Sequence, residues 1–354
     1  MRARLTLIVL ATAAALAPTP ATWIERVYSA GLYGWLQGWL TPLSNLVPFA
    51  VFDAAVGGAI VGLLGWWGWR LATAPRGRRA RTAGSLAFGT LTAAAVVYLV
   101  FLATWGLNYR RAPLTSKLDY ATDRVTAPAL LALAEESVDR LNALYGPAVE
   151  MSWPELGQLP TRLGPAFERV QRQLPSTVAA APGRPKTTLL TPYFRKAAVN
   201  GMVDPFFLEV LINADVLPFE RPFVVAHEWS HLAGFADESE ASFVGWLICQ
   251  QGDAAMQYSG WLALYQLLLR HLDARDRAPL RDALESGPSG HLRAIVARWA
   301  RSAPAVRRTA ARVYDRFLKA NRVSRGIESY DAAVRLLLGT RFEAGWIPVG
   351  RAAS

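Results

Sequence analysis

Two of the chain's four histidines, His227 and His231, lie four residues apart, and Glu228 directly follows the first. On an α-helix, residues four apart share one face at a spacing of about 5–6 Å, so both imidazoles can reach one metal ion. The glutamate of an H-E-x-x-H pattern then lies beside that ion, where it can act as a general base. The stretch therefore predicts a zinc (Zn²⁺) site; the alternative is a helix with two surface histidines and no metal.

The third protein ligand has three candidates, Asp237, Glu238 and Glu240. Asp237 fits an H-E-x-x-H-x-x-G-x-x-[H/D] arrangement, in which Gly234 lets the chain turn back toward the metal. Glu240 would instead reach in from the next helix, as in zincins whose third ligand is a glutamate. An aspartate followed three residues later by a glutamate is also typical of a helix N-cap. The sequence favours Glu240 and leaves Asp237, Glu238 and capping alone as alternatives.

These residue types suit hydrolysis by a metal-activated water. Zinc bound by two neutral imidazoles and one carboxylate keeps a fourth position for water and lowers the pKa of that water toward about 7. Glu228 is the predicted catalytic residue, which takes the proton of the water and passes it to the leaving amine. We therefore expect a zinc-dependent metallopeptidase that acts on a peptide or protein substrate. The alternatives are a non-catalytic membrane protein that uses the metal for structure or partner binding, and an enzyme that hydrolyses another amide, such as a cell-wall peptide.

The helix that carries the motif is expected to begin near Glu220 and to end at Gly234, because glycine readily adopts the left-handed conformation that follows a helix. This helix cannot span a bilayer, since three charged residues and both histidines fall within about a dozen positions. An intramembrane protease, whose histidines would lie in a long apolar run, is therefore disfavoured.

The N-terminal part of the chain is expected to lie in a membrane. Of 354 residues, 52% are hydrophobic and only 18% are charged. Three transmembrane helices are predicted, at about 5–23, 47–69 and 83–107, because about 20 apolar residues cross the hydrocarbon of a bilayer. An interfacial helix is predicted at about 31–41 from leucines and tryptophans at helical spacing. Asp53, inside the second segment, is expected to face protein or to lie near the outer interface.

The orientation follows from the arginines between the second and third segments. Five of the twelve residues at 70–81 are arginines, and none is acidic. By the positive-inside rule this loop is cytoplasmic, which places the residues after Leu107 outside. The first segment fits the same orientation, although Ala15-Leu16-Ala17 also resembles a signal-peptide cleavage site. Residues 1–107 are thus expected to form a membrane anchor, with the lipid bilayer as partner, and residues 108–354 an extracytoplasmic domain.

Charge and cysteine content exclude other classes. The net charge of +11 does not indicate a nucleic-acid partner, because outside the arginine-rich loop the basic residues are dispersed among acids. The single Cys249 excludes an intrachain disulfide framework and a cysteine-rich zinc site.

The region 108–354 is predicted to be a mostly helical α+β domain. Gly146-Pro147 is expected to stop its first helix. Glu209, in the second predicted strand, would lie either on a sheet edge that pairs with an extended substrate or toward solvent. The predicted elements are helices at 126–145 and 162–174, strands at 187–190 and 206–212, and helices from 219 onward.

Five segments, in order along the chain, carry a resemblance to a known family. They are "IERVYSAGLYGWL", "VPFAVFD", "WGLNYRRAPL", "HEWSHLAGFADESEASF" and "SYDAAVRLLLG", from about Ile24 to Gly339. They are similar to the bacterial membrane proteins numbered 3810 in the domain-of-unknown-function series. The resemblance implies an N-terminal membrane anchor followed by a zincin-like domain. Together with the orientation that the arginines indicate, this predicts a multi-pass protein of the bacterial cytoplasmic (inner) membrane with its catalytic domain on the extracytoplasmic side. The resemblance implies no substrate.

The resemblance also bears on the third ligand. Members tend to end the acidic cluster with Glu-Ala-Asn-Phe, where this chain has the similar stretch Glu240-Ala241-Ser242-Phe243. This similarity implies Glu240 as the ligand. Two positions depart from the family: Asp237 stands where many relatives have a basic residue, which keeps the choice of carboxylate open, and Arg110 stands where an aromatic residue is usual. Tyr330, in the last segment, is expected to cover the core rather than to stabilise an oxyanion.

Overall fold

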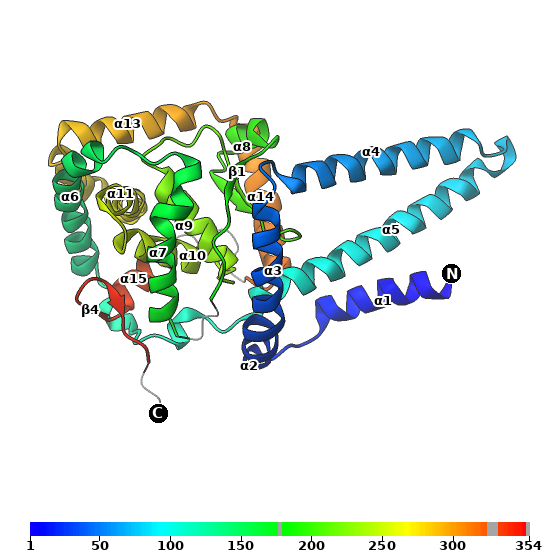
Figure 1. Ribbon diagram of the computed structural model, residues 1–354, viewed down its shortest axis with the longest axis horizontal. Helices are drawn as coiled ribbons and strands as arrows, with labels where there is room; N and C mark the ends of the chain where they lie inside the picture. Colours follow the sequence, from blue (N-terminus) through cyan, green and yellow to red (C-terminus); the bar gives the residue numbers. More distant parts are fainter. Residues whose placement is uncertain (176–178, 324–331, 352–354) are drawn as a thin grey trace.

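A computed structural model describes residues 1–175, 179–323 and 332–351, and in this part of the chain the protein is mostly helical. Figure 1 shows a rounded domain of packed helices from which α1, α4 and α5 project to one side. The elements are α1 (Arg2–Leu16), α2 (Ala21–Trp23), a π-helical stretch (Ile24–Tyr33), α3 (Gly34–Asn45), α4 (Val51–Ala72), α5 (Arg79–Thr104), α6 (Ala127–Glu150), α7 (Leu159–Gln173), β1 (Pro185–Thr187), α8 (Thr191–Ala197), β2 (Gly201–Val203), β3 (Val210–Ile212), α9 (Arg221–Leu232), α10 (Glu238–Gln250), α11 (Ala254–His271), α12 (Ala274–Asp282), α13 (Ser286–Ala300), α14 (Pro304–Ala320), α15 (Ala332–Gly339), β4 (Phe342–Glu343) and β5 (Ile347–Pro348).

The helices α4 and α5 form a hairpin that matches the second and third apolar segments of the sequence. Both α4 and the helical stretch Arg76–Thr104, which contains α5, are long and apolar enough to cross a membrane, with mean hydropathies of 1.4 and 2.2. Most side chains of α4 are exposed and none is buried, which suits lipid surroundings better than water. The arginine-rich loop lies at the tip of the hairpin, at the end farthest from the domain (Figure 1).

The sequence predicted one transmembrane helix at about 5–23. The structure instead has a shorter helix followed by a bend. The helix α1 has 15 residues and ends at Leu16, because Pro18 and Pro20 lack the backbone N–H that continues a helix and also restrict the residues before them. The chain then bends by 108° between α1 and the helical stretch Ala21–Asn45. At 1.5 Å per residue, α1 alone covers only about 22 Å. The structure therefore has two candidate spans, or three if the bent pair is one span.

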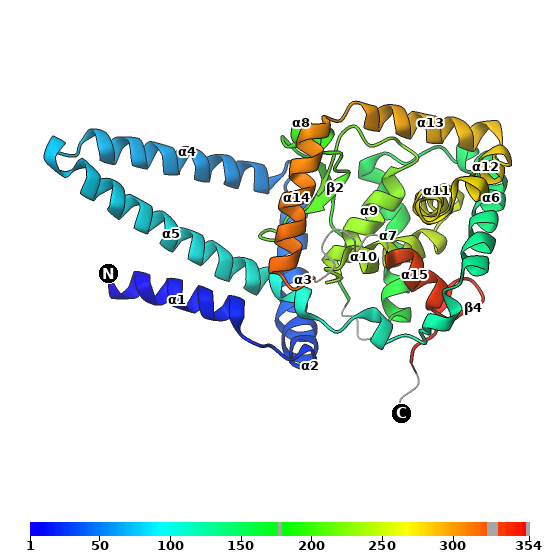
Figure 2. The ribbon, with the colours of Figure 1, turned by 180° about the vertical axis from the view of Figure 1, so that it is seen from behind.

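The domain is built around α9, which lies inside it (Figures 1 and 2). Val225, Trp229 and Leu232 of this helix are fully buried, and α7, α10 and α11 pack around it. The Trp229 ring contacts Phe167 of α7 at 5.2 Å between centroids, and its Nε1 donates a hydrogen bond to the carbonyl of Gly183 (2.8 Å). A helix buried on all sides is normally apolar all round, so the polar residues of α9 need partners inside the domain.

A small sheet lies beside α9, with strand order β1-β3-β2. The strand β1 pairs in parallel with β3, Pro185 opposite Val210, and β2 pairs antiparallel, Gly201 opposite Ile212. The strands predicted at 187–190 and 206–212 are therefore only partly correct. Because β3 is the central strand, the expectation that Glu209 borders a free sheet edge is wrong.

Glu209 is also not solvent-facing; it holds the start of α4. Its carboxylate forms a buried ion pair with Lys186 and accepts hydrogen bonds from the backbone N–H groups of Val51 (3.1 Å) and Phe52 (2.9 Å). These amides are the unsatisfied donors of a first helical turn, where negative charge is favourable. Asp53 accepts two further hydrogen bonds, each of 2.7 Å, from the segment after β1. Asp53 thus faces protein, as the sequence had indicated.

The helix α6 runs through Gly146 and Pro147, so the stop predicted there is wrong. Thr126 is its N-cap and accepts a hydrogen bond from the N–H of Ala129 (3.2 Å). Pro147 removes one helical hydrogen bond, but Pro147 and Ala143, four residues before it, lie on the exposed side, where water can solvate the freed carbonyl. Packing of α6 against α11 and α13 continues the helix past this point.

Candidate metal centre

The helix α9 and the turn after it bring the motif residues inward. Glu220 precedes the helix, and Gly234 follows it with a φ of +85°, a conformation that glycine adopts without strain. A Cβ on Gly234 would lie 2.7 Å from the guanidinium of Arg111. After the turn, α10 packs closely on α9, since a Cβ on Gly245 would lie 2.9 Å from the backbone of His227. The predicted bounds of the motif helix are confirmed.

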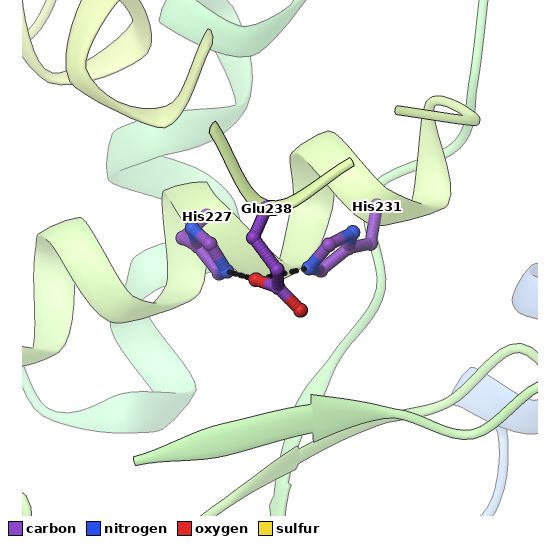
Figure 3. Close-up of side chains that lie close together, drawn as sticks. All are labelled: His227, His231 and Glu238. Carbon is purple, nitrogen blue, oxygen red and sulfur yellow. Dashed lines mark ion pairs between the residues drawn. The ribbon is translucent and has the colours of Figure 1, made fainter. Parts of the chain in front are cut away.

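The side chains of His227, His231 and Glu238 meet between α9 and the first turn of α10 (Figure 3). The imidazole centroids are 4.8 Å apart. Oε2 of Glu238 lies 3.2 Å from Nε2 of His227 and 3.5 Å from Nε2 of His231. Tetrahedral zinc with bonds of about 2.0–2.1 Å spaces its ligand atoms about 3.3 Å apart. The two distances from Glu238 are thus close to this spacing, and the three ligand atoms all lie within 4.8 Å of one another.

Glu240, the expected third ligand, is not part of this cluster. Successive residues of an α-helix point about 100° apart, so positions 238 and 240 of α10 point about 200° apart and only one can face α9. That residue is Glu238, whereas the carboxylate of Glu240 accepts a hydrogen bond from the N–H of Leu114 (2.6 Å). Glu238, and not Glu240, is therefore the carboxylate that lies beside the two histidines. Burial raises the pKa of Glu240 to about 7.

Asp237 is the N-cap of α10. Its Oδ1 accepts hydrogen bonds from the backbone N–H groups of Ser239 (2.9 Å) and Glu240 (3.4 Å), which satisfies donors that the first turn of a helix leaves free. The capping alternative is therefore correct for Asp237. This cap also places Glu238 at the first helical position, where it faces the histidines.

The other ring nitrogen of each imidazole, Nδ1, has a hydrogen-bond partner of its own. Nδ1 of His231 lies 2.7 Å from the carbonyl oxygen of Phe235, and Nδ1 of His227 lies 3.3 Å from Oγ of Ser242. Because a carbonyl only accepts hydrogen bonds, Nδ1 of His231 carries a proton, and Nε2 is the ring nitrogen that faces Glu238. Outer partners of this kind orient the histidines of metal sites.

The cluster is nearly buried, with exposed side-chain fractions of 14% for His227, 9% for His231 and 4% for Glu238. Burial alone would lower the pKa of His231, but the Glu238 carboxylate outweighs burial and raises it to about 9. Burial would likewise raise the pKa of Glu238, but the two imidazoles hold it well below its usual range. The cluster therefore stabilises a positive charge strongly.

One buried oxygen of the cluster fits a cation as its partner. Oε2 of Glu238 is fully buried and accepts no well-directed hydrogen bond, and such an atom is costly unless a cation compensates it. Two imidazole nitrogens and one carboxylate oxygen are ligands that zinc prefers. The donor set and the burial of this oxygen therefore fit zinc.

Glu228, the predicted catalytic residue, lies on α9 next to β2. Its carboxylate is buried, and the backbone of Val203 favours its charged form; a Cβ on Gly201 would lie 2.7 Å from its Oε1. Burial raises the pKa of Glu228, and the nearby imidazoles of His227 and His231 oppose this rise. Glu228 is thus beside the cluster without belonging to it, and it is a better proton acceptor than an ordinary surface glutamate.

Two further residues contact the cluster that the sequence did not indicate. The hydroxyl of Tyr314, on α14, donates a hydrogen bond to Oε1 of Glu238. Trp105, directly after α5, packs edge-on against His231 with ring centroids 6.2 Å apart. No local pattern marks either residue, because both come from distant parts of the chain. Tyr330 lies outside the described residues.

A comparison with known protein families identifies the family of this chain. The family described as "Protein of unknown function (DUF3810)" matches residues 28–338. The chain belongs to the DUF3810 family. The resemblance seen in the sequence is therefore confirmed, and the DUF3810 match includes the α4–α5 hairpin, the three residues of the cluster and Tyr314. No curated protein and no solved structure matches the chain.

Proposed function

We propose that this DUF3810 protein is a membrane-bound zinc metallopeptidase with a zincin-like domain, which hydrolyses peptide bonds of envelope or secreted proteins. One observation carries the proposal: Oε2 of Glu238 lies 3.2 and 3.5 Å from Nε2 of His227 and His231, with Glu228 beside them as a separate carboxylate. Three protein ligands leave one position of a tetrahedral ion for solvent, as in catalytic zinc sites.

The roles of the residues follow from this arrangement. His227, His231 and Glu238 would hold the ion. Zinc bound there supplies a Lewis acid that makes water nucleophilic near neutral pH. Glu228 accepts the proton as the water attacks the carbonyl carbon of the peptide, and returns it to the nitrogen as the C–N bond breaks. Because burial raises the pKa of Glu228, its carboxylate holds this proton more readily than a surface glutamate would.

A second function is favoured by how closed the cluster is. Tyr314 covers Glu238, and none of the three cluster side chains is more than 14% exposed. Because a substrate must reach a catalytic metal, a cluster shielded in this way suits a structural metal better. The alternative is therefore a non-catalytic membrane protein in which the metal braces α9 against α10. The two functions differ in whether they need Glu228.

The full-length protein, purified in detergent, is expected to contain about one zinc ion per chain, and His227→Ala is expected to lose it. Two remaining ligands cannot close a site that needs three protein ligands. Elemental analysis of the purified proteins measures the zinc content. His271→Ala is the matched control, because His271 is exposed at the end of α11 and outside the cluster, so its zinc content is expected to stay unchanged. A zinc-free wild-type protein prepared in the presence of zinc contradicts the proposal.

We also propose that the protein crosses the cytoplasmic membrane several times with its domain outside. The support is the hairpin, whose arginine-rich tip and whose domain end point in opposite directions (Figure 1), together with the positive-inside rule.

Alkaline phosphatase, which is active only outside the cytoplasm, is expected to be active when fused after Asn108 and inactive when fused after Arg79. These positions lie near the two ends of α5, so the pair reports the direction of one helix. Enzyme activity of cells that carry each fusion is the measurement. The opposite pattern would put Glu228 in the cytoplasm and exclude envelope substrates.

A further inference from the structure

The helix α3 is amphipathic, but it turns its polar side toward the domain and its apolar side outward, the opposite of a surface helix in water. Gln37 exchanges two hydrogen bonds with the backbone of Ala181 (2.7 and 2.8 Å), and Thr41 donates one to a backbone carbonyl beside β3 (3.1 Å). Trp35 and Trp39 point outward instead, with 62% and 67% of their surface exposed. Because a helix in water buries its apolar side and exposes its polar side, the outer side of α3 is suited to an apolar environment.

This outer side belongs to a larger apolar surface, which we call the tryptophan surface. A contiguous exposed apolar patch marks an interaction site, and tryptophan is enriched at the headgroup level of bilayers. The tryptophan surface consists of Trp23, Val27, Leu32, Trp35, Trp39, Leu43, Leu46 and Phe49, all exposed by 46% or more.

The tryptophan surface runs across the base of the membrane helices. The helical stretch Ala21–Asn45 bends by 108° from α1, and Figures 1 and 2 show α3 upright where α1, α4 and α5 project sideways. In a membrane crossed by α4 and α5, α3 therefore lies along the bilayer surface and not through it. Because the tryptophan surface is continuous with these membrane helices, lipid is the partner that we expect to cover it.

The helix α14 lies along the same side of the domain and has the composition of a headgroup-level helix (Figure 2). Val313 and Phe317 are exposed apolar residues on it. Long basic side chains beside such residues can lie on apolar surface and place their charge among anionic headgroups. The exposed basic residues of α14 are Arg307, Arg308, Arg312, Arg316 and Lys319.

Contacts with the end of α5 and with α14 link the candidate metal centre to this side of the domain. Trp105, which contacts His231, directly follows the candidate span α5. Tyr314, which binds Glu238, is on α14, and Phe317 of the same helix packs against Phe101 of α5 with ring centroids 5.9 Å apart. His231 is therefore only one aromatic ring away from the outer end of α5.

We propose that the tryptophan surface lies in the headgroup layer of the membrane that α4 and α5 cross, and that the metal centre cleaves polypeptides anchored in that membrane, at peptide bonds close to their membrane segments. The substrate class rests on the proposed peptidase function, whereas the placement does not. A chain anchored in the same bilayer brings its first residues outside the membrane to the height of His231, and confinement to one surface raises its effective concentration.

Spin-label accessibility tests the placement. The one cysteine, Cys249, is fully buried, so Trp35→Cys and Trp39→Cys each add one reactive thiol to the full-length protein. In vesicles of phosphatidylethanolamine and phosphatidylglycerol, the ratio of oxygen accessibility to nickel-chelate accessibility is expected to be higher for a nitroxide at either position than for one in water. Val149→Cys is the matched control: Val149 is an exposed apolar residue of α6, and this helix lies on the opposite side of the domain from the hairpin (Figure 1). The ratio of a site in water is expected there, and the same ratio at all three positions overturns the placement.

Mapping of new protein N-termini tests the substrate class. Envelope proteins are compared between cells that carry the wild-type protein and cells that carry Glu228→Gln. Termini that depend on the wild-type protein are expected within about ten residues of a membrane segment. A stretch of that length reaches at most about 33 Å from the membrane when extended. Wild-type-dependent termini in soluble proteins, or far from any membrane segment, overturn the substrate class and leave the peptidase function standing. If no termini depend on the wild-type protein, the peptidase function and the substrate class both fall, and the spin labels alone decide the placement.

Discussion

Glu238→Gln is expected to lower the affinity for zinc by more than about 100-fold, beyond the range typical of residues that only support metal ligands. Glutamine keeps the shape of the side chain but removes the negative charge that lies 3.2 and 3.5 Å from the two imidazole nitrogens. Without that charge, the cluster has two neutral nitrogens and a weakly binding amide oxygen. Zinc affinity is measured by competition with a chromophoric chelator, with elemental analysis of the purified protein in parallel.

Glu240→Gln is the matched control for this prediction. Glu240 is also a buried acid on α10, only two residues further on, and the same substitution is made. The amide oxygen of glutamine can still accept the hydrogen bond from Leu114. Because burial raises the pKa of Glu240 to about 7, its side chain is already partly neutral near pH 7, and full zinc binding is expected. Loss of zinc in Glu240→Gln but not in Glu238→Gln would return the third ligand to Glu240.

Elements whose structure depends on nearby residues could be predicted from the sequence. The helix α9 was placed correctly because a glycine ends it, and the α4–α5 hairpin because long apolar runs determine it. The first apolar segment was predicted too long because its apolar composition hides the effect of Pro18 and Pro20. The strands were misplaced because β1, β2 and β3 have only three residues each, so that pairing between distant segments, not local pattern, determines their bounds.

The face that α3 turns to the domain could not be predicted either. Its leucines and tryptophans recur with helical period, which correctly indicated a helix. The hydrogen-bond partner of Gln37, however, is 144 residues away at Ala181, so only the folded chain shows that the polar side is inside.

In the candidate site too, features set by nearby residues could be predicted and features set by distant residues could not. A spacing of four residues predicts that His227 and His231 share a face, and they do. The choice between Glu238 and Glu240 depended on where α10 begins, because a shift of two residues on a helix reverses the direction of the side chain. The cap by Asp237 sets that beginning. Tyr314 could not be predicted because it is 76 residues from Glu238 in sequence.

Glu228→Gln is expected to keep zinc and fold while turnover falls by about 10²–10⁴-fold, the usual contribution of general acid–base catalysis. The Glu228 carboxylate lies outside the His227–His231–Glu238 cluster, so its loss removes no ligand. Glutamine has the same shape and fits the space beside Gly201. It cannot accept a proton, which is the one property that the hydrolytic mechanism requires of this residue.

The measurement that separates an enzyme from a structural metalloprotein is complementation with several variants in parallel. Wild type, His227→Ala, Glu228→Gln and Glu240→Gln are each restored in a strain that lacks the protein, and the envelope proteins that accumulate are compared while zinc content and thermal unfolding are measured. In the peptidase, Glu228→Gln behaves like the strain without the protein although it binds zinc, and Glu240→Gln behaves like wild type. If the metal only braces α9 against α10, His227→Ala alone loses function, because only that variant loses the metal. A fully functional, zinc-containing Glu228→Gln protein would therefore exclude the peptidase and leave the structural role.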